Sequence, residues 1–119
     1  MTEDSGMLDD EARENIRIVR KIAENIWDGK CSFGDIKVTN SPYAEFIMPL
    51  ILYNSVNVIL TYDRSILGIA IKQEGGEIWL DDLTTQLVYD GFESCKPENI
   101  EHNFKILDTI AREIINREI

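Results

Sequence analysis

The sequence predicts an α+β fold, in which an antiparallel meander sheet of four or five strands carries an N-terminal and a C-terminal amphipathic helix on one face. Residues 43–80 are dense in β-branched and aromatic side chains and are interrupted at intervals by turn residues, which is typical of a meander. A segment on either side of this stretch places apolar residues at helical spacing. Each helix has one apolar stripe to bury, and the simplest arrangement packs both against the same sheet face. We expect residues 1–119 to form a single domain.

The first helix is predicted over residues 7–28, with charged side chains opposite an apolar stripe. Ser5 is suited to cap its N-terminus, and Gly29 is suited to the left-handed conformation that often ends a helix. Residues 1–6 are expected to be disordered. The stripe consists of Leu8, Ala12, Ile16, Val19, Ile22, Ala23 and Ile26.

The segment after this helix is interpreted as a connector over residues 30–35 and a short first strand over residues 36–39. Asn40-Ser41-Pro42 predicts a turn. The next strand, over residues 43–53, contains Pro49. Because proline has no amide donor, Pro49 predicts an edge strand, a bulge or a break in the pairing.

The rest of the meander is predicted from alternation and turn chemistry. Apolar residues alternate with others over residues 56–62, and Leu67, Ile69 and Ile71 alternate again after a turn at Asp63-Arg64. Glu74-Gly75-Gly76-Glu77 is the strongest hairpin signal, since glycine adopts positive φ without steric cost. The returning strand begins with Ile78, Trp79 and Leu80.

Residues 81–93 allow two interpretations. In the first, which propensity favours, they form a strand, because they include Thr84, Thr85, Leu87, Val88 and Tyr89. In the second, Asp82 caps a short helix that turns Leu83, Leu87 and Val88 inward. Gly91 ends the element in either case.

The last helix is predicted from Pro97 to about Arg117. Asp108 and Arg112 are expected to face away from its apolar stripe. His102 is the single histidine of the chain and falls opposite the stripe, so we interpret it as a solvated surface residue. The stripe consists of Ile100, Phe104, Leu107, Ala111, Ile114 and Ile115.

The net charge of −10 and the isoelectric point near 4.4 narrow the classes of partner. Binding to nucleic acid or to anionic lipid depends on lysine and arginine, so neither is expected. An acidic chain favours basic partners or cations. The acids concentrate in two zones: residues 1–14 hold six acids and one base, and residues 73–101 hold eight acids and one base.

Cys31 and Cys95 are well separated, which excludes a disulfide-rich scaffold and offers no zinc motif. Free thiols in a reducing cytosol are expected. The N-terminus lacks the pattern of a secretory signal. The best candidate for a membrane span, residues 46–60, is too short and is interrupted by polar residues. We therefore expect a cytoplasmic protein without a membrane segment.

No catalytic, metal or nucleotide motif is present, and no cofactor is expected. Gly75-Gly76 lacks the flanking pattern of a phosphate-binding loop. Five acids near the hairpin could bring carboxylates together at one sheet end, as Mg²⁺ or Ca²⁺ prefers, but the calcium-loop spacing is absent. A solvated acidic face is the favoured interpretation. These acids are Glu74, Glu77, Asp81, Asp82 and Glu93.

The second face of the sheet is expected to carry Ile59, Ile66 and Trp79 or their neighbours in the alternation. An apolar second face requires cover from a partner or remains an exposed patch. We therefore choose Trp79, Asp81 and Asp82 as candidate interaction residues.

Two functions follow from these predictions. The first is a non-enzymatic protein-interaction or adaptor module, either a homodimer or the binder of a protein with a basic surface. Its small size, its acidity and its amphipathic last helix resemble, in architecture alone, features of bacterial secretion-type chaperones. The alternative is a small-molecule or divalent-metal binding protein, or a minor enzyme, with a pocket between the sheet and the helices.

Overall fold

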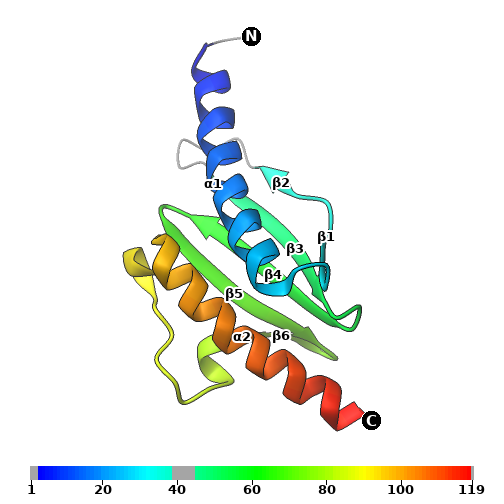
Figure 1. Ribbon diagram of the computed structural model, residues 1–119. Helices are drawn as coiled ribbons and strands as arrows, with labels where there is room; N and C mark the ends of the chain where they lie inside the picture. The colour runs from blue at the N-terminus through cyan, green and yellow to red at the C-terminus, as the bar shows by residue number, and fades with distance from the viewer. Residues whose placement is uncertain (1–2, 39–44, 119) are drawn as a thin grey trace.

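The computed structural model describes residues 3–38 and 45–118. It confirms the predicted α+β class, with two helices and one antiparallel sheet (Figure 1). The elements in chain order are α1 (Glu3–Trp27), β1 (Cys31–Phe33), β2 (Lys37–Val38), β3 (Phe46–Leu52), β4 (Val56–Asp63), β5 (Ile66–Gln73), β6 (Gly76–Trp79), the 3₁₀ helices η1 (Leu80–Asp82) and η2 (Gly91–Cys95), and α2 (Pro97–Glu118).

The sheet is a meander in which all pairs of neighbouring strands are antiparallel. Its order is β1-β3-β4-β5-β6, and the two-residue β2 pairs with β3 beside β1. The four or five strands predicted from the sequence are therefore five on the main path, with β2 as a short sixth.

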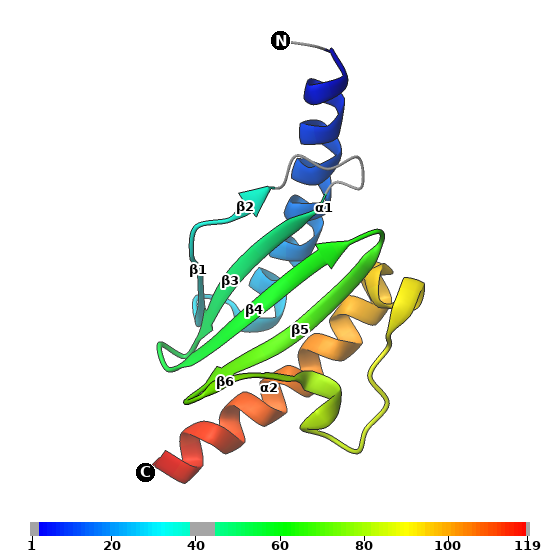
Figure 2. The same cartoon turned by 180° about the vertical axis from the view of Figure 1, so that it is seen from behind.

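Both helices lie on one face of the sheet, as predicted (Figures 1 and 2). The core lies between these layers, where Trp27 of α1, Phe104 of α2 and Met48 of β3 are at most 1% exposed. Such burial of large apolar side chains is the main source of stability in a domain of this size. Neither helix is long and apolar enough, over the residues described, to pass through a lipid bilayer.

Pro49 interrupts the pairing on one side of β3. β1 pairs with residues 50–52 of β3 and β2 pairs with residues 46–47, so Pro49 falls between them. The amide of Gly34 donates a hydrogen bond of 3.0 Å to the carbonyl of Pro49 across this gap. The break predicted from the missing donor is thus present, whereas β3 itself is an inner strand.

The predictions for the first connection need correction. Residues 31–33, expected to be part of a connector, form β1, and the strand expected over residues 36–39 is reduced to Lys37–Val38. A strand of three residues offers too few positions for alternation to be visible in the sequence. The turn predicted at Asn40-Ser41-Pro42 and the start of the meander at Tyr43 lie outside the described residues. α1 begins at Glu3, within the range 1–6 expected to be disordered.

Residues 83–90 form neither the strand nor the helix predicted for them. After Trp79 the chain turns through η1, runs without regular structure and re-enters a helical turn at η2. Figure 2 shows this segment passing beside the sheet, on the side of β6. Its backbone is hydrogen-bonded by side chains of α2, which sequence periodicity does not reveal.

Candidate functional site

The sheet face turned away from the helices is apolar along a row that crosses four strands. The register places Pro49 opposite Ile59, Ile59 opposite Ala70, and Ala70 opposite Trp79. Trp79 is 50% exposed, and Ile66 and Ile47 are 39% and 38% exposed. No helix of the described chain covers this face (Figure 2). We call it the open face, and it comprises Ile47, Pro49, Ile51, Ile59, Ile66, Gly68, Ala70 and Trp79.

Trp79 lies across β5 at Gly68. A Cβ atom at Gly68 would stand 2.9 Å from Cζ3 of Trp79 and 2.9 Å from Oγ1 of Thr61. Real Cβ contacts are longer, so a side chain at Gly68 would displace one of these neighbours. The absence of a side chain at Gly68 therefore lets the indole of Trp79 approach the backbone of β5 and extends the apolar surface of the open face.

The charges on the open face cancel. The register places Lys37 beside Ile47, Asp63 beside Ile66, and Lys72 beside Glu77. Two lysines thus balance two acids on a chain whose net charge is −10. The open face is neutral, and the acidic excess lies elsewhere.

A cavity of about 310 Å³ lies beside the open face, at the edge of β5. One wall is the consecutive run of residues 66–69, and the other is residues 88–91. Because successive strand residues point to opposite faces, a cavity lined by four in a row lies off the strand edge. We call this cavity the edge groove. The alternative function predicted a pocket between the sheet and the helices; the edge groove lies at the margin of that space, since Asn103 of α2 lines it together with Leu67 and Ile69 of β5.

The three candidate interaction residues meet at the edge groove. Trp79, Asp81 and Asp82 all line it, because β6 ends at Trp79 and η1 then turns along the groove. Asp90 joins them from the opposite wall. None of these three aspartates forms a hydrogen bond or an ion pair with the residues described. The groove therefore combines an apolar wall with uncompensated carboxylates.

The outer wall of the groove is fastened to α2 by hydrogen bonds. Asn103, which is 2% exposed, accepts a bond of 3.0 Å from the amide of Tyr89 and donates one of 3.0 Å to its carbonyl. Nε2 of His102 lies 2.8 Å from the carbonyl oxygen of Leu87, and its ring meets Tyr89 edge-on. His102 is therefore half-buried and bonded, rather than the solvated residue predicted.

The outer wall was not predicted from the sequence, although α2 carries a signal for it. Asn99 and Asn103 are separated by one helical turn and are both buried, among the apolar side chains of the inward face of α2. Buried amides need hydrogen-bond partners, so this pair indicates a neighbouring segment with free backbone groups. The side-chain amide of Asn99 donates a hydrogen bond of 2.8 Å to the carbonyl of Glu93, just as the amide of Asn103 donates one to the carbonyl of Tyr89.

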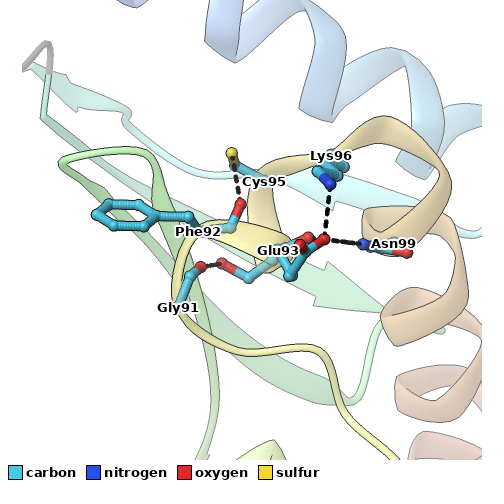
Figure 3. A network of polar contacts seen from close by, with 7 residues as sticks. Gly91, Phe92, Glu93, Cys95, Lys96 and Asn99 are labelled. Carbon is cyan, nitrogen blue, oxygen red and sulfur yellow. Dashed lines mark hydrogen bonds and ion pairs between the residues drawn. The ribbon is translucent and has the colours of Figure 1, made fainter.

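η2 is stiffened by short-range contacts (Figure 3). Lys96 pairs with Glu93 at 2.8 Å, and the buried hydroxyl of Ser94 donates to the carbonyl of Gly91 and accepts the amide of Leu67. The ring of Phe92 points away from this network and is 72% exposed. Glu93 is thus paired rather than gathered with the hairpin acids. Among the residues described, no group of three or more His, Cys, Asp or Glu side chains could hold a metal ion.

Asp108 joins three elements at the opposite side of the core. It accepts a hydrogen bond of 2.9 Å from the indole of Trp27 and one from the hydroxyl of Tyr53, and it pairs with Arg112 at 3.1 Å. Its side chain is 21% exposed, so the prediction that Asp108 faces away from the core was wrong. Burial and the hydrogen bond to Asp108 raise the pKa of Tyr53.

The thiols of Cys31 and Cys95 are both free, and burial raises the pKa of Cys31.

The raised pKa of Tyr53 predicts a loss of stability in alkali. The ordinary pKa of tyrosine is 10.0, and the pKa of Tyr53 in the folded state is higher. The stability that the protonated Tyr53 hydroxyl contributes is therefore fully present below about pH 10 and is lost as the pH rises through the folded-state pKa. We expect the stability difference between the wild type and Tyr53→Phe to narrow above pH 10. Urea unfolding over a pH series measures it, and Tyr62→Phe separates the contribution of the second tyrosine whose pKa is raised. Parallel profiles for wild type and Tyr53→Phe would contradict the prediction.

Comparison of the chain with models of known protein families, with curated proteins and with solved structures finds no match. The resemblance to secretion-type chaperones therefore stays a prediction. Any function assigned to the chain rests on its own two surfaces, the open face and the edge groove.

Proposed function

We propose that this chain is a non-enzymatic protein-interaction module that forms a homodimer through its open face. The observation that carries this proposal is the apolar row Pro49–Ile59–Ala70–Trp79, which neither helix covers. Contiguous apolar surface on a soluble domain marks an interaction site or an aggregation hazard. A homodimer removes the hazard by burying the same patch of both copies.

The charge distribution supports a second copy as the occupant. Two molecules of net charge −10 repel each other over most of their surfaces. On the open face, in contrast, two lysines balance two acids: Lys37 and Lys72 against Asp63 and Glu77. Two such faces can therefore meet without a net repulsion between acidic side chains. A partner with a basic surface is attracted instead to the acidic regions outside this face. The neutral apolar face therefore suits a copy of itself.

The proposal predicts that Ile59→Lys disrupts the dimer. Ile59 is half-buried at the centre of the apolar row, where a lysine would bring an unpaired charge into the interface. We expect self-association to weaken at least tenfold, which corresponds to about 1.4 kcal/mol. Sedimentation equilibrium over a range of concentrations measures the dissociation constant.

Asn116→Lys is the matched control, because it adds the same charge at an exposed position of α2. This variant should dimerise like the wild type. Circular dichroism of both variants checks that they fold. A wild type that remains monomeric at high concentration, or an Ile59→Lys variant that dimerises unchanged, would contradict the proposal.

A further inference from the structure

The edge of β5 is only half used by the fold. β6 pairs with Ala70–Gln73 and stops at Trp79, so no strand of the described chain pairs with residues 66–69 on that side. Within this free half, the amide of Leu67 is taken by the hydroxyl of Ser94. The edge groove follows the same stretch and replaces the continuation of β6. An incomplete strand edge beside a cavity is the geometry in which proteins receive an extended segment of another chain.

The groove is formed before any ligand arrives. Its outer wall is fixed to α2 by the paired hydrogen bonds between Asn103 and Tyr89, and η2 closes its end through the contacts of Ser94. Figure 3 shows the remaining bonds that hold η2, from Glu93 to Lys96 and Asn99. Binding to a preformed site costs little free energy, because few side chains or loops have to be ordered.

The chemistry of the lining defines the ligand. Trp79 and Val88 offer apolar surface, whereas Asp81, Asp82 and Asp90 place three carboxylates around it. These carboxylates have no cationic partner among the residues described. The volume of about 310 Å³ lies at the lower end of the range for ligand pockets. An apolar group flanked by positive charge fits this lining.

We propose that the edge groove binds a short extended segment of a partner protein, in which an apolar side chain enters the groove and neighbouring lysine or arginine side chains meet Asp81, Asp82 and Asp90. The segment lies alongside residues 66–69, where β6 does not continue. Lysine and arginine provide the charge complementarity, and burial of the apolar group beside Trp79 provides the affinity. This site extends the proposed interaction module to a second partner and does not require the dimer.

A set of three labelled heptapeptides tests this inference. The first alternates lysine with valine, the second replaces each lysine by glutamate, and the third replaces each valine by serine. Fluorescence anisotropy at low salt should show binding of the first peptide alone. Amide shifts in NMR spectra should then concentrate at Ile69 and Gly91 and at the indole of Trp79. Equal binding of the glutamate or the serine peptide, or no binding of the first, would overturn the inference.

Matched charge removals separate the groove from the general acidity of the chain. Asp81→Asn with Asp82→Asn should weaken binding of the lysine–valine peptide about tenfold. Glu74→Gln with Glu98→Gln removes the same charge from exposed positions outside both the groove and the open face, and should change affinity less than about twofold. Equal losses in both double variants would show that only the net charge matters and would overturn the site.

The Ile59→Lys variant distinguishes this inference from the proposed dimer. Ile59 lies on the open face and does not line the edge groove. A monomeric Ile59→Lys protein should bind the lysine–valine peptide with unchanged affinity. If the dimer forms in the wild type but the peptide fails to bind, the groove inference alone fails. If Ile59→Lys loses peptide binding together with the dimer, the groove does not act independently and the inference is overturned.

Discussion

Replacement of Phe104 by alanine is expected to lower the free energy of unfolding by about 3–5 kcal/mol. Phe104 is fully buried and joins the two helices, since its ring centre lies 5.2 Å from that of Trp27 at the end of α1. The truncation removes apolar contact with α1 and leaves a cavity that rigid neighbours cannot fill. Aromatic pairs of this kind also contribute beyond their buried area.

Phe92→Ala is the matched control for this prediction. It makes the same chemical change at a side chain that is 72% exposed, and surface changes of this kind stay within about 0.5 kcal/mol. Urea unfolding followed by circular dichroism measures both variants. Similar losses at Phe104 and Phe92 would mean that Phe104 is not part of a core between the helices and the sheet.

The elements that were predicted well from the sequence are those with a local periodic pattern of apolar residues. β4 and β5 alternate as expected, with Val58, Leu60 and Ile69 buried toward the helices. Both helices bury the stripes predicted for them, apart from side chains outside the described residues. Alternation and helical spacing are set by backbone geometry, so they can be recognised in the sequence alone.

The path of residues 83–90 could not be predicted because its hydrogen bonds are not local. A strand or helix satisfies its backbone through neighbours at regular spacing, whereas Leu87 and Tyr89 depend on His102 and Asn103 of α2. Threonine and valine in this segment favour a strand, but in the described structure the segment pairs with no strand and its hydrogen bonds go to α2. Tertiary hydrogen bonds override the propensity.

The candidate site was predicted from one side only. Alternation predicted that either Trp79 or its neighbours Ile78 and Leu80 face away from the helices, and the structure places Trp79 there, with Asp81 and Asp82 nearby along the chain. The opposite wall, with Asp90 and Gly91, depends on the non-local path of residues 83–90. The inner half of the groove was therefore accessible to sequence reasoning, and the outer half was not.

Trp79 belongs to both proposed surfaces. Its indole lies on Gly68 in the open face and also lines the edge groove. Truncation of Trp79 is therefore unsuited to separating the two interactions, because it removes apolar surface from both. Ile59 and the pair Asp81 and Asp82 each lie on one surface alone, and this is why the decisive variants are placed there.

Replacement of Asp108 by alanine is expected to lower the free energy of unfolding by about 2–3 kcal/mol. The carboxylate is the acceptor for the indole of Trp27, which is 1% exposed, and for the hydroxyl of Tyr53. Alanine leaves the buried indole donor without a partner, and an unsatisfied buried donor loses its full hydration. The change also disconnects α1 from the end of β3.

Two further variants separate the hydrogen bonds of Asp108 from its ion pair. Arg112→Ala should cost clearly less than Asp108→Ala, because the guanidinium is 63% exposed and water screens its pairing. Asp108→Asn keeps one oxygen for the indole and should fall between these two variants. Urea unfolding of the three proteins gives the order. If Asp108→Ala costs no more than Arg112→Ala, the carboxylate acts only as a surface ion-pair partner, and α1 is held on α2 by apolar contact alone.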